Sequence, residues 1–212
     1  MKFPVFILLS VILVLVACSD QNKPVNYSAA QIDSLKKAFF QYRAEKDSSF
    51  KTAAWSPLLP EDKNGFKGLN YYDYDISYRH ELPLLQYTKG DTIEVAGSKA
   101  GDLRKAVRCG YFEFEQSGKS QRLEVWKMLP RDSSGETHLF LGFWDVTSGN
   151  ETYPGGRYLD IKKINEQKYL VDFNYAYNPY CAYSDRYSCL IPPMDNRLTI
   201  ALTCGEKIYK MH

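Results

Sequence analysis

Polar and aromatic side chains are concentrated between residues 145 and 178, around a glycine-rich turn that could hold a ligand. The segment begins where an alternating apolar row, 137–145, ends in a carboxylate, and an expected strand starts again at Arg157 after two glycines. Carboxylate, amide and hydroxyl groups hydrogen-bond polar small molecules, and tyrosine rings stack on flat ones. We interpret the following residues as a candidate site for a small polar or anionic ligand, such as a sugar: Asp145, Thr147, Thr152, Tyr153, Arg157, Tyr158, Asp172, Asn174 and Asn178.

The same cluster has two other interpretations. It can be a hydrogen-bonded network that closes the sheet, since buried polar groups must be satisfied. Asp145 and Asp172 could also act as the acid and base of a hydrolase that cleaves envelope glycan. A buried Asp145 would need a cation, and the planar fork of Arg157 is the nearest along the chain. The sequence therefore predicts Arg157 within ion-pair distance of Asp145 or Asp172, and it leaves enzymatic activity undecided.

Signatures of cofactors and of other catalytic machinery are weak in this sequence. There are three histidines, and no serine lies in a Gly-x-Ser-x-Gly elbow. No helix is expected after Gly155 and Gly156 to present its N-terminus to a phosphate. The cysteine spacing matches no common zinc pattern. We expect no metal and no cofactor, and a net charge of +2 without a basic run gives no indication of nucleic-acid binding.

The N-terminus predicts export and a lipid anchor. Lys2 precedes an apolar run over 3–17, which is typical of an export signal and is shorter than the roughly 20 residues that span a bilayer. The sequence Leu-Val-Ala before Cys18 resembles the lipobox of bacterial lipoproteins, where cleavage precedes an acylated cysteine; an ordinary secretory signal is the alternative. We expect a signal peptide at 1–17, acylation (palmitate or a similar chain) at Cys18 and a tether at 18–27.

These expectations place the protein in the bacterial cell envelope, lipid-anchored at the outer membrane, with its domain periplasmic or surface-exposed. The membrane is then a partner through the anchor, and oligomeric state is undetermined. The remaining chain is long enough for one sizeable core rather than two, so we expect a single mainly β domain over 28–212.

One amphipathic helix is expected at the start of this domain. Ser28 and Gln31 form a capping box, and apolar residues follow at helical spacing to about Asp47. The apolar stripe consists of Ile32, Leu35, Phe39 and Tyr42. This stripe should dock on the rest of the domain, because an isolated helix of this length is marginal in water.

From residue 70 onward, apolar and polar residues alternate, which indicates strands. The chain contains 17 tyrosines and 11 phenylalanines, and aromatic residues of this kind favour strands. The expected strands are 72–78, 82–87, 91–96, 106–115, 121–128, 137–145, 157–163, 168–174, 196–203 and 206–210. About ten strands after one helix predict a mainly β fold, an antiparallel barrel or sandwich.

Several short motifs resemble those of a family of bacterial proteins known as domain-of-unknown-function family 1684. They include Ser56-Pro57-Leu58, Asp145-Val-Thr-Ser-Gly149, Thr152-Tyr-Pro-Gly-Gly-Arg157-Tyr-Leu-Asp160, Asp172-Phe-Asn174 and Asn178-Pro-Tyr-Cys-Ala-Tyr183. The resemblance covers nearly all of the chain after the signal. It implies a mostly β domain of unassigned activity, found in exported lipoproteins and in proteins without a signal, and it implies no catalytic residues. Cys109 and Cys204 depart from the family pattern.

Four cysteines remain if Cys18 is acylated, and an even number in an exported domain suggests two disulfides with three possible pairings. Cys181 and Cys189 would close a short loop. The two cysteines outside the family pattern, Cys109 and Cys204, both lie in expected strands and could form the second pair.

Overall fold

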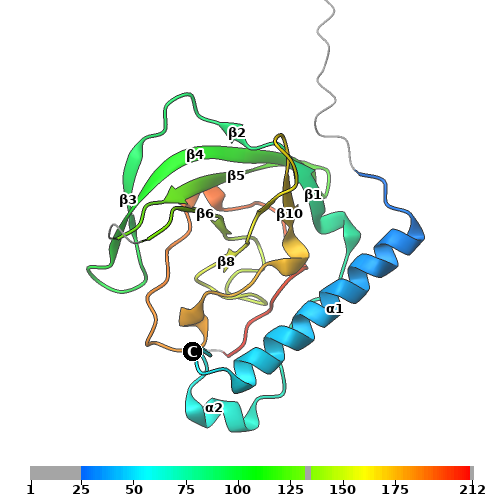
Figure 1. Ribbon diagram of the computed structural model, residues 1–212, viewed down its shortest axis with the longest axis vertical. Helices are drawn as coiled ribbons and strands as arrows, with labels where there is room; N and C mark the ends of the chain where they lie inside the picture. The colour runs from blue at the N-terminus through cyan, green and yellow to red at the C-terminus, as the bar shows by residue number, and fades with distance from the viewer. Residues whose placement is uncertain (1–24, 132–134, 211–212) are drawn as a thin grey trace, which may run out of the picture.

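A computed structural model describes residues 25–131 and 135–210 of the 212-residue chain. A long helix, α1 (Ala29–Thr52), crosses one side of the domain, and the long hairpin of strands β4 (Leu103–Gln116) and β5 (Lys119–Met128) lies on the opposite side (Figure 1). The predicted signal peptide, Cys18 and most of the tether lie outside the described residues. Within them, no helix is both long and apolar enough to span a bilayer.

The predicted capping box defines where α1 begins. The backbone N–H of Gln31 donates to the Ser28 hydroxyl (3.3 Å), and the N–H of Ser28 donates to the Gln31 side chain (2.8 Å). The helix ends at Thr52, beyond the predicted end near Asp47, because the last turns place Phe50 in the core, where it is 2% exposed.

Helix α1 packs on the rest of the domain through aromatic side chains. The ring of Phe39 is fully buried and lies 5.4 Å from the rings of Tyr74 and Tyr175. The Arg43 guanidinium lies 4.1 Å from the ring centroid of Tyr71, so this arginine also packs on the domain, through a cation–π contact.

Ten strands in the described residues form three antiparallel sheets. The strands are β1 (Arg79–Leu82), β2 (Leu85–Gln86), β3 (Thr92–Ala96), β4 (Leu103–Gln116), β5 (Lys119–Met128), β6 (His138–Phe140), β7 (Gly142–Phe143), β8 (Arg157–Tyr158), β9 (Lys162–Lys163) and β10 (Tyr169–Asp172). The largest sheet has the order β2-β4-β5-β6, with β3 also paired to β4. The other sheets have the orders β1-β10-β9 and β7-β8.

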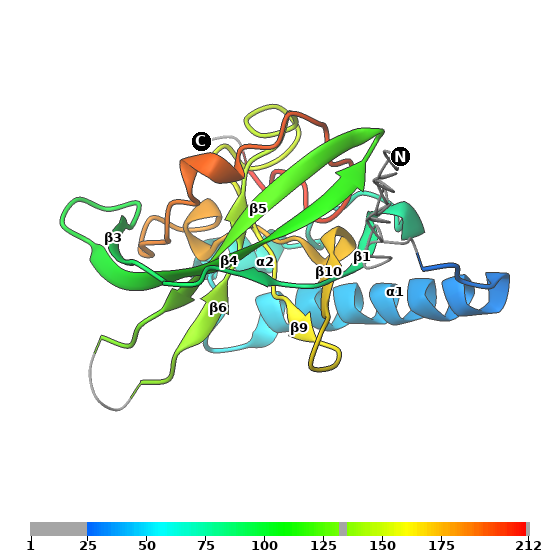
Figure 2. The same cartoon turned by 90° about the horizontal axis from the view of Figure 1, so that it is seen from above.

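The β4–β5 hairpin contains the two longest of the described strands and extends along the domain in Figure 2. Its turn uses Ser117 and Gly118 at φ 54° and 70°, the left-handed geometry that closes a tight hairpin. Its inner face supplies Phe112, Leu123 and Val125, all fully buried, to the main core. Phe143, Phe173 and Leu202 complete this core from the other segments.

The predicted mainly β, antiparallel character and the single long N-terminal helix are confirmed. The described strands form open sheets and no closed barrel. A short second helix, α2 (Pro60–Gly65), lies between α1 and the first of the described strands.

Three predicted strands are wrong. Within 72–78, the side chain of Asp75 accepts the N–H of Ser77 (2.8 Å) and caps a 3-10 turn instead of joining a ladder. Segments 196–203 and 206–210 are irregular, with isolated bridges such as Trp144–Arg197. Side chains, described below, satisfy much of the backbone there, so a regular ladder is not required.

Candidate functional site

Arg157, the first residue of β8, is the centre of a buried polar network. Its side chain is 0% exposed, and its Nη2 lies 2.7 Å from Asp145 Oδ2, also 0% exposed. Nη2 also donates to the carbonyl of Leu202 (3.0 Å), and Nη1 donates to the carbonyls of Cys204 and Glu206. The predicted Arg157–Asp145 pair is confirmed, and it connects the 145–157 turn to the irregular C-terminal segment.

The other oxygen of Asp145 organises the turn that follows it. Oδ1 accepts hydrogen bonds from the backbone N–H of Thr147 (2.8 Å), the Thr147 hydroxyl (2.6 Å) and the N–H of Leu202 (3.3 Å). The hydroxyls of Thr147 and Thr152 are 2.9 Å apart. Since both carboxylate oxygens are occupied by protein donors, these residues form a closed structural network.

Position 156, directly before Arg157, requires a glycine. It adopts φ +85°, and a Cβ at this position would lie 2.7 Å from the carbonyl oxygen of Phe143. A glycine is therefore needed for the backbone to pass close to β7 and direct the arginine inward.

Asp172 lies in a separate cluster and is not a partner of Arg157. Its Oδ2 accepts from Arg79 Nη1 (2.9 Å), and its Oδ1 accepts from the backbone N–H and side-chain amide of Asn174 (3.1 and 2.8 Å). The Asn174 amide also exchanges two hydrogen bonds with the backbone of Asp75 (2.9 and 2.8 Å). The side chains of Asp145 and Asp172 are 0% and 4% exposed and each is held in an ion pair, a geometry that gives no support to paired acid–base catalysis.

Glu206 is a buried charge that sequence reasoning missed. It is 1% exposed and forms an ion pair with Lys46 of α1. Its Oε2 accepts from the backbone N–H of Asn178 (2.8 Å) and the hydroxyl of Tyr183 (2.6 Å). The Asn178 amide donates to the carbonyl of Lys207 (2.9 Å). A single glutamate at the start of an expected strand carried no pattern that predicts this role.

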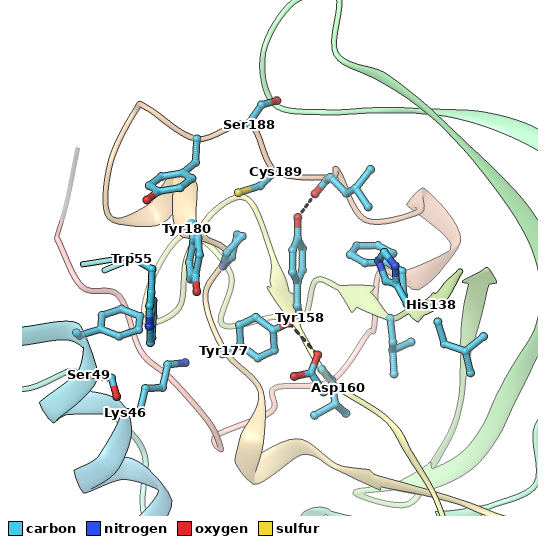
Figure 3. A pocket seen from close by; sticks show the side chains of 18 of the residues that line it. Lys46, Ser49, Trp55, His138, Tyr158, Asp160, Tyr177, Tyr180, Ser188 and Cys189 are labelled. Atoms are coloured by element: carbon cyan, nitrogen blue, oxygen red, sulfur yellow. Dashed lines mark hydrogen bonds between the residues drawn. The ribbon is translucent and has the colours of Figure 1, made fainter. Parts of the chain in front are cut away.

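A cavity of about 630 Å³ lies beside these networks and not within them. Figure 3 shows it between α1, the segment around Tyr158 and the loop around Tyr180. Of the nine predicted ligand-binding residues, Tyr158 alone is among those that line it. The ring-bearing lining residues are Tyr42, Phe50, Trp55, His138, Phe140, Tyr158, Tyr177, Tyr180 and Tyr187.

The tyrosines of this cavity are positioned by fixed partners. The Tyr158 hydroxyl donates to the carbonyl of Leu190, and the Tyr177 hydroxyl donates to Asp160 Oδ1 (2.9 Å), as drawn in Figure 3. Burial raises the pKa of both phenols, so both remain protonated donors. Trp55 and Tyr180, by contrast, are 55% and 37% exposed.

The cations that line the cavity are paired with carboxylates, whereas the carboxylates that line it have no cationic partner among the described residues. Lys46 is paired with Glu206, and Arg104 donates to Asp102 (3.2 and 2.8 Å) and to the carbonyl of Ser188 (2.7 Å). The two carboxylates in the lining itself, Glu45 and Asp160, are exposed and have no cationic partner among the described residues. The groups free to bind a ligand are therefore mainly hydrogen-bond acceptors and aromatic faces.

Residues 64–207 match the family model described as "Protein of unknown function (DUF1684)". The chain belongs to the DUF1684 family. A solution NMR structure of an uncharacterised protein of Haloarcula marismortui is similar to it, with 30% sequence identity, a TM-score of 0.65, and coverage of 87% of this chain and 100% of that one. No curated protein matches the chain.

The matched DUF1684 region contains the Arg157 and Asp172 networks, whereas α1 and Trp55 precede it. One wall of the aromatic cavity thus lies outside the part of the chain that the family model describes.

Cys181 and Cys189 are adjacent in this DUF1684 domain. The backbone N–H of Cys181 donates to Cys189 Sγ (3.1 Å), and the Tyr153 hydroxyl donates to Cys181 Sγ (3.7 Å). A hydrogen bond between the two thiols lowers the pKa of Cys181 to about 6 and raises that of Cys189. Both are thiols in the structure. The disulfide stays a prediction, for which non-reducing peptide mapping of exported protein is the direct measurement.

Cys109 and Cys204, the second predicted disulfide pair, both pack in the main core. Cys109 Sγ lies 3.2 Å from the carbonyl oxygen of Val125, and Cys204 is 0% exposed. Burial raises the pKa of both thiols, which keeps them protonated and poorly reactive. Both are also thiols in the structure, so this pairing stays a prediction as well.

Proposed function

We propose that the protein is a cell-envelope lipoprotein that binds a small polar ligand with a ring, such as a sugar, in the aromatic cavity. The observation that supports this function is the set of exposed and half-buried rings around a space of about 630 Å³, within the usual range of roughly 300–1,000 Å³ for small-molecule sites. No catalysis is proposed.

The free groups of the cavity favour a neutral, hydroxyl-rich ligand over an anion. The flat faces of Trp55 and Tyr180 are available for stacking on the apolar face of a sugar ring. Glu45 and Asp160 can accept hydrogen bonds from its hydroxyls. An anion would meet these carboxylates, while both lining cations are already paired with protein carboxylates.

The cavity is tested with neutral disaccharides as probes, namely maltose, cellobiose and diacetylchitobiose. Trp55 is far more exposed than Trp126 and Trp144, which are each 7% exposed, so quenching or enhancement of tryptophan emission reports mainly on Trp55. We expect one of these probes to change the emission of the full chain in a saturable manner.

Removal of a stacking ring should weaken this binding. Tyr180→Ala is expected to cost about 1 kcal/mol, roughly a fivefold increase in Kd. Phe40→Ala is the matched control, because Phe40 is a similarly exposed aromatic residue (43%) that is not among those lining the cavity. Emission that no probe alters, or equal affinity in the Tyr180→Ala and Phe40→Ala variants, would count against the proposal.

The lipid anchor is the second part of the proposal and is supported by the lipobox-like residues before Cys18. Multiple acyl chains on one cysteine would hold the domain stably at a membrane. Mass spectrometry of the membrane fraction should find the mature N-terminus at Cys18 with its lipid. Cys18→Ser should leave the protein soluble or uncleaved, and unchanged membrane attachment of this variant would refute the anchor.

A further inference from the structure

A second cavity, of about 890 Å³, lies at one end of the large sheet, and all but one of its charged lining residues are basic. It is formed by the β3–β4 connection, the end of β5 and the loop around Ser188. In Figure 1 the β3–β4 connection projects from the side of the domain away from α1. We call this cavity the basic cleft. Its charged lining residues are Lys99, Asp102, Arg104, Lys105, Arg131 and Arg186.

Asp102, the one carboxylate in this lining, is saturated by its neighbours. It accepts two hydrogen bonds from Arg104, one from Arg131 Nη2 (2.6 Å) and one from the Ser188 hydroxyl. These hydrogen bonds hold the pKa of Asp102 well below its usual range, so it remains ionised and holds Arg104 and Arg131 together. It can neutralise only one of the five cations.

The excess of positive charge persists when the neighbouring strand is considered. Glu94 of β3 lies opposite Lys105 of β4 in the ladder and can offset that lysine. Two carboxylates against five cations still leave an excess of three positive charges, whereas the whole chain carries only +2. A local field of this kind, bounded by protein walls, attracts polyanions.

We propose that the basic cleft is a binding site for phosphate groups that carry more than one negative charge. Arginine guanidinium groups bind phosphate oxygens through paired hydrogen bonds, and Lys105 and Arg131 supply further charge from exposed positions. The site is separate from the aromatic cavity, with which it shares a wall of Arg104, Tyr187 and Ser188. It does not depend on a sugar binding next to it.

Pyrophosphate is the probe, because it has a high charge and no ring that could enter the aromatic cavity. Calorimetric titration of the full chain in a low-salt, phosphate-free buffer should show saturable binding that weakens as NaCl is added. The double variant Lys105→Ala/Arg131→Ala should raise the Kd at least tenfold. Arg104 is left unchanged in this variant because it also donates to the carbonyl of Ser188 and so joins β4 to the loop on the other side of the cleft.

The matched control is Lys162→Ala/Lys163→Ala, which removes the same charge from the exposed strand β9. It should keep the Kd within about twofold of wild type, since only charges within about 10 Å act strongly at ordinary ionic strength. Absence of pyrophosphate binding, or an equal loss in the two double variants, would overturn the inference. A tyrosine variant of the aromatic cavity, Tyr180→Ala, should bind pyrophosphate normally, which separates this outcome from that of the proposed function.

The source of the phosphate is distinguished by competition with bound pyrophosphate. Displacement by soluble glycerol 3-phosphate would indicate a free phosphate compound, and displacement only by vesicles of phosphatidic acid, whose headgroup is also a phosphate monoester, would indicate a lipid headgroup. Either result supports a phosphate site. Equal displacement by neutral phosphatidylcholine vesicles would contradict it, because net negative charge would then not be what the cleft recognises.

Discussion

Replacement of Arg157 by alanine is expected to lower the free energy of unfolding by about 3–5 kcal/mol, the cost of breaking a buried ion pair by removing one partner. Asp145 would be left as a fully buried carboxylate without its cation. The carbonyls of Leu202 and Cys204 would also lose their donor. Urea unfolding, followed by circular dichroism, measures this loss directly.

The matched control is Arg131→Ala, because Arg131 is also paired with an aspartate but its side chain is 67% exposed. Exposed ion pairs contribute roughly 0–1 kcal/mol, so this variant should unfold close to wild type. Arg157→Lys should give an intermediate loss, since an ammonium group retains the charge but cannot reach the aspartate and all three carbonyls as the planar guanidinium does. If Arg157→Ala and Arg131→Ala unfold at the same urea concentration, the network is not structural.

Local signals predicted the parts of the fold that depend on neighbouring residues. The capping box located the start of α1, and the expected strands 106–115 and 121–128 located the β4–β5 hairpin, because each depends on residues close together in sequence. The alternation over 72–78 was misleading, since Asp75 hydrogen-bonds its own backbone and makes a turn there. The predictions of strands at 196–203 and 206–210 were wrong for another reason. The side chains of Arg157 and Asp145, which are distant in sequence, hydrogen-bond the backbone of 202–206 in place of a neighbouring strand.

The candidate site was predicted only in part. The Arg157–Asp145 pair could be predicted because Asp145 ends an alternating apolar row and was therefore expected to be buried. A buried carboxylate without a cation is costly, and Arg157 is the nearest cation along the chain. Asp172 was grouped with it, although Arg79, from a segment 93 positions away, is its actual partner. The aromatic cavity required the assembly of α1 with the 177–190 loop, and the positions of Trp55 and Tyr180 carry no periodic signal of that contact.

Glu206 provides the second large effect, because it links α1 to the domain. Glu206→Ala is expected to lower the free energy of unfolding by about 3–5 kcal/mol, since Lys46 would lose its partner in a site where it is only 14% exposed. The N–H of Asn178 and the hydroxyl of Tyr183 would also lose their acceptor. Urea unfolding measures the loss, and Glu151→Ala, an exposed glutamate with a long 3.7 Å contact to Lys207, is the matched control.

A double-mutant cycle with Lys46→Met shows whether the ion pair itself carries this effect. Methionine keeps the unbranched stem of Lys46 beside Phe50 and Tyr177 and removes the charge. If the charge pair dominates, the two single variants should each be strongly destabilised, and the double variant should be less destabilised than their sum. Strict additivity would assign the role of Glu206 to the Asn178 and Tyr183 hydrogen bonds instead. The cavity is affected as well, because Lys46 lines it. Loss of Glu206 would leave a free ammonium group in the cavity lining and reduce the preference for neutral ligands.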